Sequence, residues 1–334
     1  MEAFHSRFKR RVITIPTVIV LGLIWILLLP LWLPLGILVD VFRSTPPVVA
    51  RSGLCITHYF LMEFFGLLGC LFLWLGRLLF LVRGEQAYLN VHYTLQRLWG
   101  AGLLRGSCWL FRLDLRVEGA EHLERGPVLV FMRHVTLMDT LFPASAFGQP
   151  RGLKLRYLIK RELLLEPCLD VCGQRIPNLF VDRSGLKRDE TLAKVKALAT
   201  DMGAEDGVIL YPEGTRFTLG KRARLIQRFR EKGEEAQAEK AESLQNLLPP
   251  RYGGPLACFE GAPDADVVIV GHVGFEGAAN VRHFLSGRVY NNPVIIKMWR
   301  YSRSEVPEDE AGRKAWLEAR WFELDQWVSE QHVE

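Results

Sequence analysis

Residues 127–139, PVLVFMRHVTLMD, contain the change of pattern that decides how this chain folds. The run from Pro127 to Met132 is short, apolar and β-branched at two positions, which is typical of a buried strand. The stretch after it has apolar residues at roughly helical spacing. His134 therefore lies at a strand-to-helix junction, where its ring can fold back toward Asp139 in the following helix.

This pair has two interpretations. If the carboxylate of Asp139 contacts the imidazole of His134, it fixes the tautomer and stabilises the imidazolium, as in a general base and its orienting group. The alternative is a capping or solvated histidine beside an unrelated surface aspartate, which is the commoner case for a single such pair. The rest of the chain has to decide between them.

Further apolar runs alternate with helical patterns. Residues 189–202 and 308–328 each place apolar side chains on one helical face. An alternation of this kind predicts an α/β domain with a mixed, largely parallel sheet flanked by helices. The expected strands besides residues 127–132 are LRVEG, RYLIK, NLFVD, GVILY, DVVIVGHVGF and PVIIKMW.

The N-terminal part of the chain is apolar. Val12 to Val39 has no charged residue, although prolines within it would kink or shorten a helix. Leu54 to Gly76 contains Glu63 as its one formal charge. We expect residues 1–84 to form a membrane anchor of one or two apolar helices. A cleaved signal peptide is the alternative for the first segment, and a re-entrant or interfacial helix for the second, because His58 and Glu63 are costly in hydrocarbon.

Basic residues precede the first apolar segment, so the positive-inside rule places the N-terminus in the cytoplasm. With two crossings the C-terminal domain is also cytoplasmic. We expect an integral membrane protein of a bacterial inner membrane, although an endoplasmic reticulum protein has the same pattern. Residues 85–114 mix tryptophan with arginine, which suits an interfacial helical segment, and a helix covering the core is the alternative. Residues 115–334 form the α/β domain, with a charged helical insertion at 221–248.

The net charge is +5, and residues 221–232, KRARLIQRFREK, are strongly basic. Such a run fits anionic lipid headgroups or phosphorylated ligands, or a solvated helix face. No nucleic-acid-binding motif accompanies it, so a nucleic-acid partner is not expected. The cysteines have no metal-ligand spacing. We interpret them as buried thiols, with a structural metal site as a remote alternative.

Two more strands end in polar motifs. In NLFVDRSG, residues 178–185, a strand delivers Arg183 to its carboxyl end, where ligands bind in α/β sheets. In VILYPEGTR, residues 208–216, Gly214 allows a tight turn next to Thr215, and Arg216 suits phosphate. Glu213 holds that arginine or bonds to a substrate hydroxyl. His272, within the apolar run 266–274, is interpreted as a buried structural histidine rather than a second base.

These motifs together resemble a known family. HVTLMD is similar to the H-x-x-x-x-D signature of the glycerolipid acyltransferases, which include the lysophosphatidate acyltransferases. NLFVDR and YPEGTR resemble two further blocks of that family, and the three occur in family order. The resemblance covers about residues 115–300. It implies acyl transfer from a thioester, acyl-CoA or acyl carrier protein, to a lysophospholipid hydroxyl, with no metal or other cofactor.

The resemblance also implies residue roles. His134 deprotonates the acceptor hydroxyl, and Asp139 orients His134. The acceptor is positioned by Arg183, Glu213 and Arg216, beside Gly214 and Thr215. The leading expectation is conversion of 1-acylglycerol-3-phosphate to phosphatidic acid. There are three alternatives: an acyltransferase for another lysophospholipid, a transacylase, and a non-catalytic lipid-binding protein of the same fold. Arg133 departs from the family, which often has Asn or Ser there, and it could add a cation near the phosphate.

Overall fold

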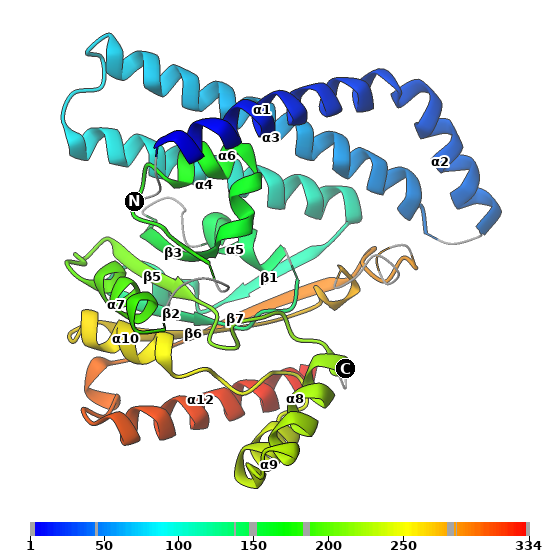
Figure 1. Cartoon of the computed structure of the whole chain (residues 1–334). Helices are drawn as coiled ribbons and strands as arrows, with labels where there is room; N and C mark the ends of the chain where they lie inside the picture. Colours follow the sequence, from blue (N-terminus) through cyan, green and yellow to red (C-terminus); the bar gives the residue numbers. More distant parts are fainter. Residues whose placement is uncertain are drawn as a thin grey trace.

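A seven-stranded sheet forms the centre of the computed structural model, in the order β1-β7-β6-β2-β5-β3-β4 (Figure 1). All neighbouring strands run parallel except β6 and β7, which are antiparallel. The predicted mixed, largely parallel sheet is therefore confirmed. The structure describes residues 4–43, 46–136, 138–146, 152–182, 188–278, 284 and 286–331. The strands are β1 (Asp114–Glu118), β2 (Val128–Met132), β3 (Lys154–Lys160), β4 (Leu179–Val181), β5 (Asp206–Leu210), β6 (Asp266–Val273) and β7 (Pro293–Tyr301).

Strand β2 lies in the middle of the sheet. Val128 is aligned with Gly207 of β5 on one side and with Asp266 of β6 on the other, and all three strands point the same way. The loops after β2, β5 and β6 therefore meet at one edge of the sheet. This is the edge where open α/β sheets bind ligands.

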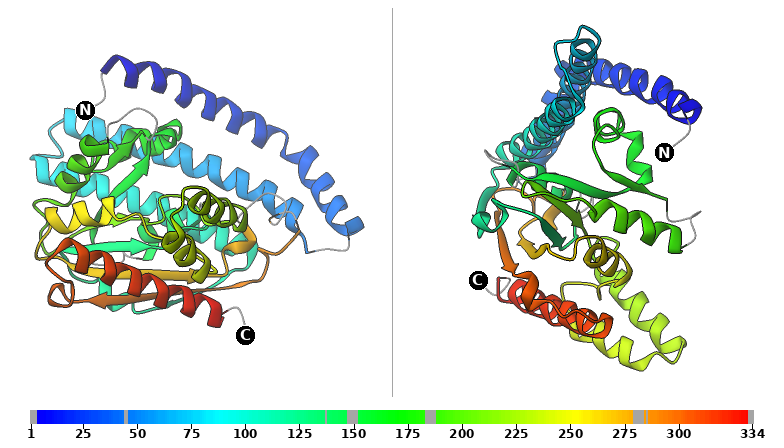
Figure 2. Two further views of the ribbon diagram at one scale, coloured as in Figure 1. Left: turned by 60° about the horizontal axis from the view of Figure 1, so that its bottom comes forward. Right: turned by 90° about the vertical axis from the view of Figure 1, so that its left-hand side faces the viewer.

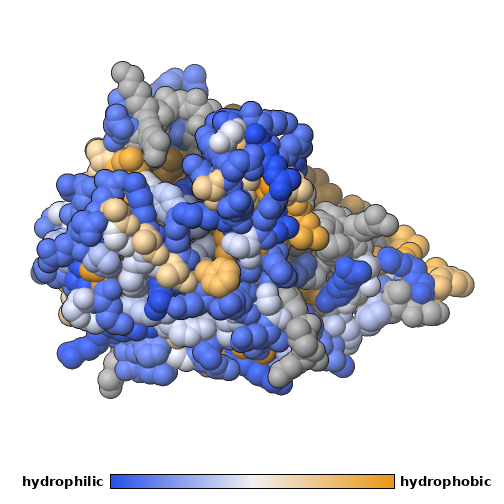
Figure 3. Space-filling view, turned by 90° about the horizontal axis from the view of Figure 1, so that it is seen from below, coloured by the Kyte–Doolittle hydropathy of each residue, from blue (hydrophilic) through white to orange (hydrophobic). Residues whose placement is uncertain are grey.

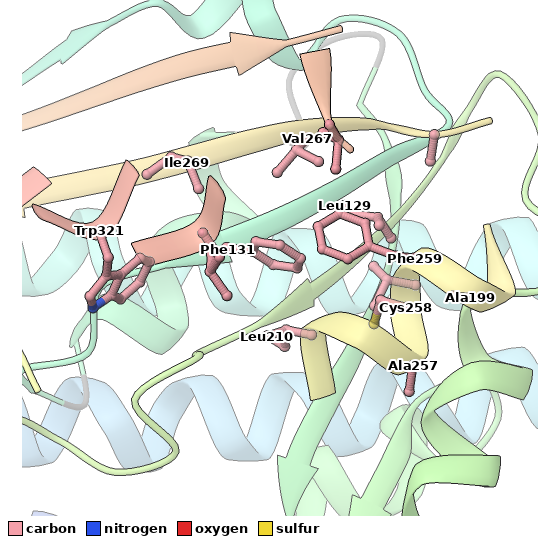
Figure 4. Packing of buried hydrophobic residues seen from close by; sticks show 14 of the residues in the cluster. Leu129, Phe131, Ala199, Leu210, Ala257, Cys258, Phe259, Val267, Ile269 and Trp321 are labelled. Carbon is pink, nitrogen blue, oxygen red and sulfur yellow. The ribbon is translucent and has the colours of Figure 1, made fainter. Parts of the chain in front are cut away.

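Alternate residues of β2 are buried on opposite faces of the sheet. Leu129 and Phe131 pack in one core against α7 (Arg188–Ala199), α10 (Gly253–Gly261) and α12 (Glu310–Gln331) (Figure 4). Trp321 of α12 is fully buried there, and its Nε1 donates to the carbonyl oxygen of Leu248 at 3.1 Å. The predicted C-terminal amphipathic helix is thus confirmed.

The other residues of β2 face a second core. Val128, Val130 and Met132 pack with Leu104 of α4 (Glu85–Phe111) and Phe142 of α5 (Met138–Ala146). Because both faces of β2 are covered, the strand is a continuous apolar run rather than an alternating one. Burial of Leu104 shows that α4 covers the core, the alternative considered for this segment. An additional place at a membrane interface stays a prediction.

The apolar N-terminal helices lie together at the top of Figure 1. They are α1 (Phe4–Leu27), α2 (Leu29–Arg43) and α3 (Val48–Leu78), with a break at Leu28 inside the first apolar segment. Among the described residues, His5–Leu27 and Val48–Leu78 are long and apolar enough to cross a membrane. Both helices are candidate membrane anchors.

The polar residues of α3 face the protein. His58 Nε2 lies 2.9 Å from the carbonyl oxygen of Gly102 in α4. Glu63 is buried and accepts a hydrogen bond from the backbone N–H of Cys168 in α6 (Pro167–Gly173) at 3.0 Å. Helix α3 is continuous, and His58 and one carboxylate oxygen of Glu63 contact neighbouring helices, which lowers the cost of these polar groups in an apolar segment. A re-entrant or interfacial position of α3 stays an untested alternative.

The charged insertion forms two helices, α8 (Leu219–Glu231) and α9 (Glu235–Ser243), and residues 244–252 after them are not helical. The α8–α9 hairpin lies at the opposite end of the molecule from α1 and α3 in Figure 1 and in the right-hand view of Figure 2. All six cysteines are free. Their expected burial holds for Cys70, Cys168, Cys172 and Cys258, whereas Cys55 and Cys108 are half-buried. The remaining short elements are the 3₁₀ helices η1 (Ala120–Leu123), η2 (Arg161–Leu165), η3 (Glu276–Ala278) and η4 (Arg303–Glu305).

Candidate active site

His134 follows β2 directly, and Asp139 lies in the first turn of α5. His134 Nδ1 lies 3.2 Å from Asp139 Oδ2. The side chain of His134 is 16% exposed, whereas that of Asp139 is fully buried. The pairing expected from the strand-to-helix junction is therefore present, and the carboxylate approaches the imidazole from the protein side.

The carboxylate of Asp139 accepts several hydrogen bonds from the loop between β2 and α5. The backbone N–H groups of Val135 and Thr136 donate to it at 2.5 and 2.9 Å, and the hydroxyl of Thr136 donates at 2.7 Å. Burial alone would raise the pKa of Asp139, but hydrogen bonds from His134 and His272 hold that pKa well below its usual range. An ionised Asp139 accepts the Nδ1 proton of His134, which leaves Nε2 as the basic nitrogen.

His272 lies behind Asp139. Its Nε2 is 3.1 Å from the carbonyl oxygen of Arg133 and 3.4 Å from Asp139 Oδ2. The side chain is fully buried and is not part of the cleft wall. The interpretation of His272 as a buried structural histidine is supported, and the structure adds that it shares a carboxylate with His134.

Arg133 points away from the cleft. Its side chain is buried, and its guanidinium contacts Glu276 Oε1 at 2.7 Å and the carbonyl oxygens of His272 and Asn246. The expectation that Arg133 adds a cation near a substrate phosphate is therefore wrong. Side chains alternate across a strand, and this position directs the guanidinium into the interior beside β6.

Glu213 holds the backbone around His134. Its Oε1 accepts from the N–H of His134 at 2.9 Å, and its Oε2 accepts from the N–H of Leu248 at 3.0 Å. Burial raises the pKa of Glu213 to about 8, and the two N–H donors oppose that rise. Both carboxylate oxygens face these buried amides rather than Arg216. A contact of Glu213 with a substrate hydroxyl stays a prediction.

The rest of the EGTR motif shapes the loop. Gly214 has a φ of +67°, a conformation that L side chains rarely adopt. Thr215 Oγ1 accepts from Lys221 Nζ at 2.8 Å, and Phe217 N–H donates to the carbonyl oxygen of His134 at 2.7 Å. Arg216 is exposed at the cleft and forms no side-chain ion pair with the described residues. Arg183, the remaining expected substrate-binding residue, lies outside the described residues.

One cleft with a volume of about 2330 Å³ reaches from α3 and α4 past His134 to α8 and α12. Near α4 its wall includes apolar residues such as Trp99, Leu103 and Leu141. Toward α8 the wall is basic. The cleft is larger than the roughly 300–1,000 Å³ of an ordinary small-molecule site, so it has room for two substrates.

The motifs in the sequence did not single out two residues of the site, Tyr211 and Arg251. Tyr211 packs its ring 4.5 Å from that of His134, and its hydroxyl donates to the carbonyl oxygen of Asp139 at 3.1 Å. Arg251 lies against Gly214 and was not singled out. The position of Tyr211 directly before PEGTR was an available signal, whereas Arg251 joins the site through the turn after the insertion. No group of three or more metal-ligating side chains occurs in the described part of the chain.

The chain has one family-model match and a structural similarity to a known protein. Residues 114–242 match the family model described as Acyltransferase, a range that contains His134, Asp139 and the EGTR motif. The chain is similar in structure to the 1-acyl-sn-glycerophosphate (LPA) acyltransferase PlsC from Thermotoga maritima. The sequence identity is 16%, the TM-score is 0.49, and the match covers 82% of this chain and 98% of that chain. No curated protein sequence matches the chain.

Proposed function

We propose that this chain, whose residues 114–242 match the acyltransferase family model, transfers a fatty acyl chain from an acyl thioester to the hydroxyl of a lysophospholipid. The observation that carries the proposal is His134 in the wall of an amphiphilic cleft, paired with the buried carboxylate of Asp139. A buried carboxylate and a partly exposed imidazole are the parts that general-base catalysis requires.

In this mechanism Nε2 of His134 takes the proton of the acceptor hydroxyl as the oxygen attacks the thioester carbonyl carbon. A C–O bond forms, and the charge of the resulting imidazolium is balanced by Asp139. When the tetrahedral intermediate collapses, the C–S bond breaks and the leaving thiolate takes the proton from His134. The products are the acyl ester and a free thiol, and no covalent acyl-enzyme is formed.

The acceptor is proposed to be 1-acylglycerol-3-phosphate, which gives phosphatidic acid. Arg216 supports a phosphate-bearing acceptor, because it is exposed in the cleft wall close to His134. The residue after it, Phe217, donates its N–H to the carbonyl oxygen of His134. Its planar fork of donors suits phosphate oxygens. Gly214 and Thr215 build the turn that presents it, and Glu213 secures that turn from below.

The proposed substrates also account for the N-terminal helices. Lysophospholipids reside in or at a bilayer, and the apolar end of the cleft opens beside α3 and α4, the side of the molecule that carries the candidate anchors. Arg10 and Arg11, at the start of the apolar run of α1, both contact Asp170 of α6. This contact supports the N-terminus and the catalytic domain lying on one side of the membrane, which the positive-inside rule makes the cytoplasmic side.

The test is an assay of the full chain in lipid nanodiscs with a labelled acyl thioester and a panel of lysophospholipids, beside His134→Ala. We expect a diacyl product with 1-acylglycerol-3-phosphate and a loss of about 10²- to 10⁴-fold in the variant. Product with a different headgroup only would retain the reaction and replace the acceptor. Equal activity in a folded His134→Ala protein would refute the mechanism and favour a lipid-binding role.

A further inference from the structure

Helix α4 has an outer face that belongs neither to the core nor to the cleft wall. Leu98, Arg105 and Trp109 are separated by seven and four residues, so they lie in one row along the helix. Leu98 is 55% exposed, Trp109 is 78% exposed, and Arg105 is exposed between them. Arg112, the residue that ends the helix, is exposed as well. We call Leu98, Arg105 and Trp109 the outer row of α4.

Helix α3 packs along the length of α4. The two helices run antiparallel: His58 Nε2 lies 2.9 Å from the carbonyl oxygen of Gly102, while Gly69, later in α3, lies against Leu95, earlier in α4. Figure 1 shows both helices next to each other on one side of the sheet. The outer row of α4 is therefore next to α3 and not isolated on the surface.

Helix α3 has an exposed row of its own. Leu61, Phe65 and Phe72 are separated by four and seven residues, and they are 40%, 57% and 62% exposed. They belong to Val48–Leu78, one of the two described helices that are long and apolar enough to cross a membrane. These side chains have no protein cover in the described chain, as expected for a surface that contacts lipid.

The two rows lie on the same side of the helix pair, away from α6. Glu63 of α3 accepts from the backbone of α6, and His92 of α4 contacts Arg175, just after α6, at 3.0 Å. Phe65 is two residues from Glu63, and Leu98 is six residues from His92, which turns them about 200° and about 120° around their helices. The apolar row of α3 and the outer row of α4 therefore form one continuous surface.

The positive charge on this surface is not neutralised by carboxylates of the described residues. Neither Arg105 nor Arg112 forms an ion pair with them, and Arg112 lies over the ring of Tyr290, 5.9 Å from its centroid. Arg116, on the neighbouring strand β1, instead pairs with Asp114 at 2.8 Å. Two unpaired arginines beside an apolar surface favour an anionic partner.

We propose that the outer row of α4, together with Arg112, rests on the headgroup layer of an anionic bilayer. Trp109 lies between headgroups and acyl chains, and Arg105 and Arg112 contact lipid phosphates. Tryptophan and arginine at the border of an apolar helix are the residues that suit a membrane–water interface. Continuity with α3 identifies the occupant, because a bilayer that covers the apolar row of α3 meets the row beside it with its headgroups. The inference does not depend on the proposed reaction.

The opposite side of the molecule supports this choice. The face seen from below, where α8, α9 and α12 lie, is mostly hydrophilic (Figure 3). The exposed aromatic and apolar rows are thus a property of the α3–α4 side, the side of the candidate membrane helices. Helix α4 also supplies Trp99 and Leu103 to the cleft wall. A bilayer against its outer row therefore places the apolar end of the cleft beside the lipid headgroups.

The first test identifies what covers Trp109. The photo-crosslinking residue p-benzoylphenylalanine replaces Trp109 in the full chain, held in vesicles of equal parts phosphatidylcholine and phosphatidylglycerol. Mass spectrometry should find a phospholipid adduct at this position, as at Phe65, and none at Phe322, an exposed aromatic residue of α12. A crosslinked dimer at Trp109, or no adduct there while Phe65 gives one, would overturn the proposal.

The second test examines the arginines through the ratio of phosphatidylglycerol to phosphatidylcholine adducts at Trp109. Arg105→Gln/Arg112→Gln should lower this ratio by about fivefold for each arginine removed, and Arg105→Lys/Arg112→Lys should keep most of it because the charge remains. Lys194→Gln/Lys232→Gln removes the same charge from exposed positions of α7 and α8 and should leave the ratio unchanged.

Two results would refute the contact of the arginines with lipid phosphates. One is an equal ratio in the wild type and the glutamine variant of α4, and the other is an equal fall in the variant of α7 and α8, which would show an effect of net charge only. Neither test uses acyl transfer. The bilayer contact can therefore stand if the proposed function fails, and it can fail while the acyltransferase assay succeeds.

Discussion

Asp139 and Glu213 are both buried carboxyl groups that contact His134, but their surroundings shift their pKa values in opposite directions. Asp139 contacts the imidazole ring and accepts from two backbone N–H groups, a hydroxyl and two histidines. Glu213 contacts the backbone N–H of His134 and that of Leu248. Burial raises the pKa of both, but the donors around Asp139 reverse that effect and those around Glu213 do not.

The comparison shows that burial alone does not set the charge of a carboxyl group. Each hydrogen bond to the ionised form offsets part of the desolvation cost, and the number of donors decides the result. Asp139 is built to stay charged next to a base that becomes cationic during the reaction. Glu213 holds two loops in place through the backbone N–H groups of His134 and Leu248.

The largest effect is expected from Asp139→Asn. The side chain keeps its size but loses its charge, and its amide donates where Asp139 accepted, so the His134 tautomer is no longer fixed. We expect kcat to fall by about 10³- to 10⁴-fold. The assay is steady-state kinetics, with circular dichroism as a check on folding. A folded variant with nearly full activity would show that Asp139 does not support His134.

A pH effect on stability is expected from Glu213. Its pKa of about 8 in the folded protein lies above the value of about 4.3 expected in the unfolded chain. The folded state therefore binds the proton more tightly, and this contribution is complete below about pH 4, declines as the pH rises and is lost above about pH 8. The free energy of unfolding of the wild type should fall over this window relative to Glu213→Gln, by an amount on the order of 5 kcal/mol.

The measurement is denaturant unfolding of both proteins at several pH values between 5 and 9. Glu213→Gln should also lose about 1–3 kcal/mol at pH 5, because its amide N–H₂ faces a backbone N–H that Glu213 accepted. Parallel pH curves for the two proteins would mean that Glu213 stays ionised, and the contrast with Asp139 would disappear.

A smaller effect is expected from His272, whose Nε2 shares Asp139 with His134. His272→Phe removes this donor, so more of the negative charge of Asp139 acts on His134. We expect kcat to fall by about tenfold and the acid limb of the kcat/KM profile to move to higher pH. His272→Gln keeps an N–H in a similar place and should recover part of both. An unchanged pH profile in a less active His272→Phe would reduce His272 to a packing role.

The smallest effect is expected from Tyr211→Phe. The variant keeps the ring beside His134 and removes only the hydroxyl that donates to the carbonyl oxygen of Asp139. A neutral hydrogen bond of this kind contributes about 0.5–1.5 kcal/mol, so kcat/KM should fall by less than about tenfold. A loss as large as that of Asp139→Asn would assign the Tyr211 hydroxyl a direct role in the chemistry.

Much of the fold could be predicted from the sequence. All seven strands were expected from local apolar runs, which are most continuous in β2, β5 and β6 because these strands are buried on both faces. The position of the break between α1 and α2 could not be predicted as well. Prolines marked the region as kinked, but the division at Leu28 depends on how the two helices pack against α3.

The candidate site also has contacts that the sequence predicted and contacts that it did not. The contact of His134 with Asp139 follows from residues five apart across one junction, so local geometry was enough to predict it. The direction of the Arg133 side chain was predicted wrongly, and the backbone contacts of Glu213 were not predicted, because each residue contacts groups far away in the chain: Glu213 reaches Leu248, and Arg133 reaches Glu276. Nothing near either residue in the sequence shows which way its side chain points.

The sequence by itself determined the α/β class, the apolar N-terminal segments, and the motifs that end β2, β4 and β5, because periodicity and turn residues act over short distances. Only the tertiary structure decided which of the polar residues face the cleft and which hold the loops beneath it. The parallel pairing of β2 with β5 and β6 brings distant loops to one edge of the sheet. Whether a carboxyl group there is charged depends on donors from several of these loops at once.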